Sequence, residues 1–162
     1  MFLQQICEWI EQTSVAVTIA ESAWMFPTLE SIHVIALGLV VGSIAMVDLR
    51  LLGLSAPSLR ISRLSEDVLP WTWASFAVAV ATGVLLFASN ATSYYDNIPF
   101  RLKLVLIALA GANMLLFHFG AYRRVAEWDH GVPAPLPARM AGALSLTFWI
   151  GVVTAGRWIG FV

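Results

Sequence analysis

SIHVIALGLVVGSIAMV, residues 31–47, is a run of 17 residues without a formal charge. Three further charge-free runs follow it, at residues 68–95, 104–122 and 140–156. A helix that crosses the hydrocarbon core of a bilayer needs about 20 mostly apolar residues, and helices satisfy all their backbone hydrogen bonds internally. The sequence therefore predicts an all-α integral membrane protein, an up-down bundle with spans near residues 29–53, 69–90, 100–123 and 139–161.

The composition supports the same class of protein. Of the 162 residues, 59% are hydrophobic and 12% are charged, and the formal net charge is −1. A soluble domain carries about 25% charged residues, and a nearly neutral chain has no strong field to attract a polyanion. A single cysteine, Cys7, excludes an internal disulfide and a cysteine-rich metal cluster formed by this chain alone. We therefore expect one transmembrane domain over residues 1–162, in contact with lipid and without a nucleic-acid partner.

Residues 1–20 have the pattern of an amphipathic helix. Glu8 and Glu11 interrupt the apolar residues, so the segment does not resemble a secretory signal. The apolar residues recur at helical spacing and predict a short helix lying at the membrane interface; they are Phe2, Leu3, Ile6, Trp9 and Ile10.

Proline indicates where a span begins, and the distribution of basic residues predicts the orientation of the chain in the membrane. Pro70 is expected in the first turn of the second span, where its missing N–H costs least. The side of the membrane opposite the N-terminus holds six arginines, against three basic residues on the N-terminal side. The positive-inside rule then places both termini outside, which in a bacterial inner membrane is the periplasm. The two sets are Arg50, Arg60, Arg63, Arg123, Arg124 and Arg139, against Arg101, Lys103 and Arg157.

Small residues four apart recur in every span. Such pairs allow helix backbones to approach closely in lipid. Tight packing within one chain is the first interpretation, and a seam between chains of a homo-oligomer is the alternative. The pairs are Gly38 with Gly42, Ala77 with Ala81, Ala108 with Ala112, and Gly151 with Ala155.

Ionisable groups inside spans are costly and indicate function. Near the N-terminal side, Glu30 and His33 share a helix face, while Lys103 and Arg157 approach from the third and fourth spans. Anchoring at the lipid headgroups is the alternative for such side chains. His33 has no long stem with which to reach the interface, so it is the strongest candidate in this layer.

A second polar layer lies near the opposite membrane face. It contains His118, which shares a helix face with Met114, together with Asp48, Arg50 and Arg123. A buried pair of Asp48 with Arg50 or with His118, fixing helix ends, is the alternative to a functional site. Asn113 is expected to bond across helices. His33 and His118 differ in depth by about 22 Å at 1.5 Å per residue, so they cannot ligate one haem within a monomer.

Several stretches together resemble an uncharacterised bacterial four-helix membrane family. They occur in the order expected for that family and cover nearly the whole chain: ESIHVIALGLVVGSIAMVDLRLLGL (30–54), LPW (69–71), TGVLLF (82–87), FRLKLVL (100–106), Asn113 with His118, and AGR (155–157). The chain is more loosely similar to copper-resistance D-like membrane domains. It is also loosely similar to the haem-b-containing four-helix protoporphyrinogen oxidases, with His33, Lys103 and His118 at the positions that correspond.

The looser similarity implies haem b or a metal within the bundle. Imidazole is a common haem ligand and methionine a common partner, so His33 and His118 are the expected ligands of an outer and an inner site. Lys103 and Arg157, or Arg50 and Arg123, then suit the propionates. Glu30 and Asp48 are the expected acceptors of the second ring N–H.

We thus expect a membrane redox protein that passes electrons to a partner protein. Copper is the first alternative, held by His33 with Met25 or by His118 with Met114, because thioethers suit Cu(I). A cofactor-free accessory subunit that forms a homo-oligomer is the second alternative.

Overall fold

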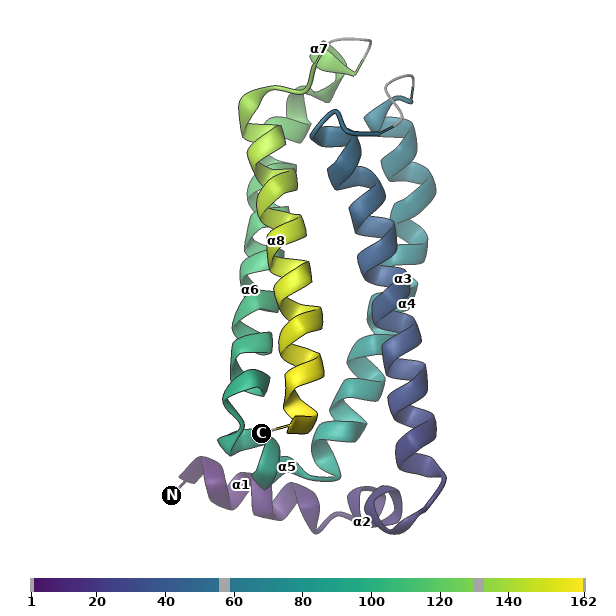
Figure 1. The fold of residues 1–162 in the computed structure, drawn as a ribbon, viewed down its shortest axis with the longest axis vertical. Helices are drawn as coiled ribbons and strands as arrows, with labels where there is room; N and C mark the ends of the chain where they lie inside the picture. The colour runs from purple at the N-terminus through teal and green to yellow at the C-terminus, as the bar shows by residue number, and fades with distance from the viewer. Residues whose placement is uncertain (1, 56–58, 130–132, 162) are drawn as a thin grey trace.

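Four long antiparallel helices dominate the computed structural model, which describes residues 2–55, 59–129 and 133–161 (Figure 1). They are α3 (Met25–Leu51), α4 (Ile61–Ala88), α6 (Ile98–Phe119) and α8 (Leu136–Trp158). Each belongs to a helical segment that is long and apolar enough to cross a membrane. No strand occurs within the described ranges. The predicted all-α membrane bundle is confirmed, and both ends of the chain lie at the same end of it (Figure 1).

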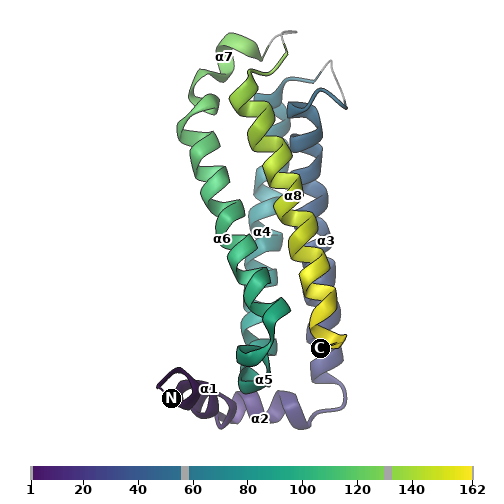
Figure 2. The same ribbon diagram turned by 60° about the vertical axis from the view of Figure 1, so that its left-hand side comes forward.

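The bundle is built from two helix pairs, α3 with α4 and α6 with α8, and α8 also packs on α3 (Figures 1 and 2). The face that α4 buries is rich in small hydroxyl side chains, and the Thr72 hydroxyl donates a 2.8 Å hydrogen bond to Ser43 Oγ of α3. Small residues let two backbones approach closely in lipid, where no hydrophobic force draws helices together. From Thr72 onward the buried residues of this face recur every three or four positions, at Thr72, Ser75, Ala79, Thr82 and Leu86, and Ser65 lies two turns earlier on the same face.

The middle of the bundle is filled by larger apolar side chains. Val40, Trp149 and Val152 are buried together with Ala110, and Phe76 of α4 packs against them. A second cluster lies at the end distant from the termini, where Trp128 and Ile61 are buried. The bundle therefore has a packed core at its centre and another at one end, while most remaining apolar side chains face outward toward lipid.

The second span begins earlier than the sequence predicts. α4 starts at Ile61, nine residues before Pro70, so Pro70 lies inside the helix and not in its first turn. The early start is stabilised by Asp129, whose carboxylate accepts hydrogen bonds from the backbone N–H (3.2 Å) and the hydroxyl of Ser62. Such a cap satisfies N–H groups that the first helical turn leaves without partners. The cap comes from 67 residues away along the chain.

The N-terminal segment forms two helices where the sequence predicts one. α1 (Phe2–Glu11) and α2 (Ser14–Glu21) are separated at Thr13, which caps α2 by accepting from Ala16 N at 3.4 Å. Both lie across the end of the bundle that carries the termini (Figures 1 and 2).

A carboxylate of α1 connects the two N-terminal helices to the bundle by hydrogen bonds. Glu11 accepts hydrogen bonds from the backbone N–H (2.8 Å) and the hydroxyl (2.7 Å) of Thr92, in the first turn of α5 (Ala91–Asp96). The Phe2 and Trp9 side chains stay exposed, as an interfacial helix requires.

Packing within one chain accounts for only one of the four small-residue pairs. Ala155 is buried, and a Cβ at Gly151 would lie 2.9 Å from Leu106 Cδ1 of α6. The other three pairs are exposed, and a Cβ at Gly38 or Gly42 would meet nothing within 4 Å. Tight packing within one chain is therefore the wrong interpretation for those three pairs, because each of these helices turns a different face toward its neighbours.

We expect Gly142→Ala to destabilise the bundle. A Cβ at this position would lie 3.2 Å from both Asp48 O and Leu51 Cβ of α3, so α8 and α3 must separate. Overpacking of this kind costs about 1–3 kcal/mol of unfolding free energy. Gly111→Ala is the matched control, since a Cβ there would meet nothing within 4 Å. Unfolding in mixed detergent micelles, followed by circular dichroism, measures both; equal transitions for Gly142→Ala and the parent would contradict the close crossing.

Candidate functional site

His33 lies at the centre of a polar cluster to which three of the long helices, α3, α4 and α6, contribute side chains. It is the ninth residue of α3 and is half-buried at the end of the bundle that carries the termini. Its Nδ1 atom is 3.0 Å from Thr82 Oγ1 of α4, and its Nε2 atom is 3.3 Å from Lys103 Nζ of α6. The structure thus brings together two of the predicted residues, His33 and Lys103, and adds Thr82.

The hydrogen bonds favour one tautomer of the His33 ring. With the Thr82 hydroxyl donating to Val78 O at 2.7 Å and the Lys103 amine donating to Nε2, the arrangement is completed by Nδ1–H donating to Thr82 Oγ1. The Nε2 atom then faces Lys103 Nζ, and a single proton lies between these two nitrogens. His33 is therefore held in one orientation, with its second nitrogen pointed toward α6.

Two glycines give the cluster its space. A Cβ at Gly83 of α4 would lie 3.0 Å from His33 Cε1, and a Cβ at Gly156 of α8 would lie 3.6 Å from Lys103 Nζ. A side chain at Gly83 would press on the imidazole ring, whereas one at Gly156 would reach ordinary van der Waals contact with the lysine. The imidazole and the amine have room to meet because Gly83 of α4 and Gly156 of α8 carry no side chain.

An aromatic cluster adjoins these residues. The rings of Phe87 and Phe100 stack with centroids 5.4 Å apart, and Tyr94 lies 5.3 Å from Phe100. Burial, and secondarily the negative charge of Glu30, raise the pKa of the Tyr94 phenol above its ordinary value. The aromatic faces provide flat apolar surface within one helical turn of Gly83 and of Lys103.

Other residues expected in the outer layer lie elsewhere. Thr82, and not Glu30, is the partner of His33 Nδ1, and Glu30 is exposed. The Arg157 guanidinium lies over the Phe161 ring at 5.0 Å. Met25 is exposed at the first position of α3, two turns from His33. The outer cluster is thus smaller than the sequence predicts.

The inner layer does not contain the predicted Asp48 pairs. Asp48 is buried between α3 and α8, within hydrogen-bonding reach of Ser145, and its Oδ2 atom has no hydrogen-bond partner. Arg50 is also buried, but its Nε atom donates to Leu59 O at 2.8 Å. His118 is exposed on α6 and stacks on Tyr122, with ring centroids 5.4 Å apart. These side chains point in different directions because their helices turn different faces inward.

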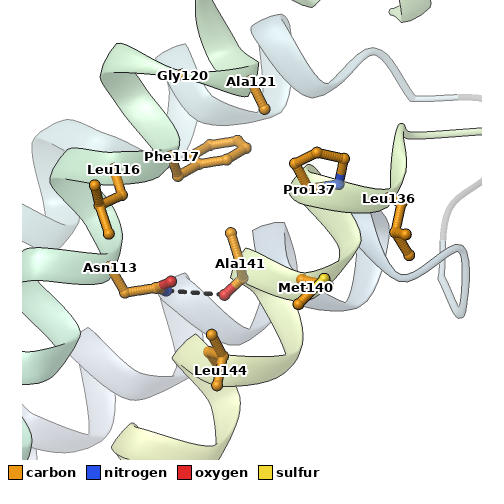
Figure 3. A pocket seen from close by; sticks show the side chains of 10 residues that line it. All are labelled: Asn113, Leu116, Phe117, Gly120, Ala121, Leu136, Pro137, Met140, Ala141 and Leu144. Carbon is orange, nitrogen blue, oxygen red and sulfur yellow. Dashed lines mark hydrogen bonds between the residues drawn. The ribbon is translucent and has the colours of Figure 1, made fainter.

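The remaining inner residues lie on the surface of α6. Met114 and His118 are both exposed, and Arg123 lies with His118 at a shallow surface hollow. Asn113 bonds across helices as expected: its Nδ2 atom donates to Ala141 O of α8 at 2.9 Å. This bond forms the floor of an apolar groove of about 340 Å³ between α6 and α8, with Phe117 on one wall (Figure 3).

The sequence pattern did not single out Thr82, Gly83 or Gly156. Thr82 and Gly83 begin TGVLLF, and Gly156 lies within AGR, so all three fall in stretches that carry the family resemblance. The one signal available for Thr82 was its place among small and hydroxyl residues that recur at intervals of three or four along α4. That spacing predicts a buried face but does not show which α3 residue lies opposite.

We expect Gly83→Ala to displace the His33 ring. The ring is held by hydrogen bonds at both nitrogens, so a methyl group 3.0 Å from Cε1 must break or lengthen at least one of them. Gly156→Ala is the control, because its Cβ would make ordinary van der Waals contact with Lys103 at 3.6–3.8 Å. Histidine side-chain ¹⁵N chemical shifts report both bonds; unchanged His33 shifts in Gly83→Ala would contradict the contact.

Comparisons with known proteins provide a family but no activity. No curated protein and no solved structure matches the chain. Within the described ranges, no three or more His, Cys, Asp or Glu side chains form a group that could hold a metal ion. The expected membership of an uncharacterised family is confirmed, while the looser similarity to copper-resistance and oxidase families stays a prediction. The chain belongs to DUF6644, a family of unknown function, whose model matches residues 6–162.

Proposed function

We propose that this protein binds haem b within the membrane, with His33 as an axial ligand, and serves as a redox protein. Bound haem would supply one-electron chemistry, which none of the chain's own side chains supplies as readily. The observation that carries the proposal is the fixed orientation of His33, whose Nδ1–H is anchored by Thr82 while Nε2 points into the bundle.

That orientation is the one expected of a metal-ligating histidine. Such residues usually donate the second ring N–H to a protein acceptor, which fixes the tautomer and the plane of the ring. Here the acceptor is the Thr82 hydroxyl, at 3.0 Å.

The surroundings of His33 also suit haem. Lys103 provides a positive charge at the same depth, and a basic side chain beside the ligand pairs well with a propionate. Phe87, Phe100 and Tyr94 supply aromatic faces nearby. His118 has no comparable anchor and is exposed, so a second haem there would lie at the lipid-facing surface or between two copies.

The exposed small-residue pairs favour a second function, that of a subunit in a homo-oligomer. Gly38, Gly42, Ala77 and Ala81 face outward and leave space for another helix. Copper handling has weaker support, because Met25 lies about 12 Å along α3 from His33 at 1.5 Å per residue. Met114 and His118 together offer two donors, both exposed.

The proposed location is the bacterial inner membrane with both termini in the periplasm, which places the His33 cluster near the periplasmic face. The arginine asymmetry supports this orientation. A C-terminal alkaline phosphatase fusion, active only in the periplasm, is expected to be active. An active C-terminal fusion of a reporter that works only in the cytoplasm would contradict the orientation.

The visible spectrum of the purified protein tests haem binding. Protein produced in haem-supplied cells and extracted in mild detergent is expected to show a Soret band. A reduced pyridine haemochrome should identify haem b at about one per chain, since the described part of the chain offers one anchored imidazole. A colourless protein that also fails to take up added haemin would overturn the proposed function.

A further inference from the structure

The nitrogen of His33 that would bind iron already has a partner in this structure. Nδ1–H is committed to Thr82, so Nε2 carries the one lone pair that the ring can offer. Lys103 Nζ lies 3.3 Å from Nε2, where a hydrogen bond occupies that lone pair. Iron and the lysine therefore compete for the same atom.

Lys103 is held in place by little else. Within the described part of the chain, the contact with His33 is the one polar contact of its Nζ atom. On the α8 side it faces Gly156, where no side chain restrains it. Lys103 lies in the second turn of α6, so its flexible stem needs only a rotation to carry the ammonium toward the nearby membrane face.

From this geometry we propose that Lys103 is a gate on His33: it caps Nε2 in the haem-free protein and must withdraw before Nε2 can bind iron. This inference rests on the proposed function. Once the lysine withdraws, the lone pair of Nε2 is no longer occupied by a hydrogen bond. The withdrawn Lys103 ammonium can then pair with a propionate carboxylate of the haem.

The gate predicts that one substitution accelerates both the association and the dissociation of haem. In Lys103→Met, which keeps an unbranched chain but removes the charge, haemin should associate about tenfold faster, since a charged hydrogen bond no longer has to break. Haem should also dissociate faster, because the Lys103 ammonium that pairs with a haem propionate is gone. A lysine that only supports the fold would slow association or leave it unchanged.

Stopped-flow mixing of haemin with haem-free protein in detergent measures association, and transfer to apomyoglobin measures dissociation. Lys103→Arg is the control, because it keeps a cation that can cap Nε2 and should associate at close to the parental rate. The His33 ¹⁵Nε2 chemical shift in haem-free protein checks the cap directly and should move toward that of an unbonded nitrogen in Lys103→Met.

The outcomes separate the two proposals. Faster association together with the ¹⁵N shift supports the gate. Haem binding by the parent with equal or slower association in Lys103→Met overturns the gate and leaves the haem proposal standing. A parent that binds no haem overturns the proposed function itself.

Discussion

Substituting His33 by alanine is expected to remove the Soret band from the purified protein. Among the described residues, the variant loses the one imidazole whose second nitrogen is anchored by a protein acceptor, at 3.0 Å from Thr82. Haem content should fall from about one per chain to near zero, because no other described histidine is anchored in this way. Absorption spectra and pyridine haemochromes of matched preparations measure the effect.

His118→Ala is the matched control for this experiment. His118 is exposed, stacks on Tyr122 and has no anchored ring nitrogen in the described structure, so its loss should leave the outer haem in place. Circular dichroism and gel filtration show whether each variant is folded. Full haem content in a folded His33→Ala protein would contradict the site, and loss of haem in His118→Ala alone would move it to the other end of the bundle.

Substituting Thr82 by valine should weaken haem binding by about 10–100-fold, the usual effect of removing a hydrogen-bond partner from a ligating histidine. Valine preserves the shape of threonine but cannot accept the Nδ1 proton of His33. The ring then loses its fixed orientation, although the α4 backbone and Gly83 still confine it. Haemin titration of the haem-free protein gives the change in dissociation constant.

Thr82→Ser distinguishes this effect from a packing defect. Serine keeps the hydroxyl and loses a methyl group from the buried α3–α4 interface, so it should bind haem much as the parent does. If serine and valine weaken binding equally, the methyl group and not the hydrogen bond is responsible, and the role assigned to Thr82 is wrong.

The sequence predicts the spans well because their signal is local. Charge-free runs locate α3, α4, α6 and α8, and a missing charge needs no knowledge of neighbouring helices. The start of α4 is different, since its cap comes from Asp129 far along the chain. The position of Pro70 inside the helix follows from that distant contact, which no local pattern contains.

The candidate site is predicted only in part for a related reason. His33 and Lys103 stand out because ionisable groups inside a span are rare. Their contact, and the part played by Thr82, depend on how far each helix is rotated about its axis. Small-residue spacing does not determine that rotation, as the outward-facing Gly38 and Gly42 demonstrate. Glu30 was the nearer acceptor in sequence, yet Thr82 of α4, 49 residues after His33, supplies the actual one.

Chemical rescue of His33→Gly by added imidazole is the most direct test of the central claim. The glycine leaves a space beside Thr82 and Lys103, which free imidazole can enter and in which both of its nitrogens find the partners of the lost ring. We predict that the variant binds no haem alone and recovers the Soret band as imidazole is added, while His118→Gly needs no rescue. The claim that His33 is the ligand would be contradicted if the His33→Gly protein bound haem as the parent does and its spectrum did not change when imidazole was added.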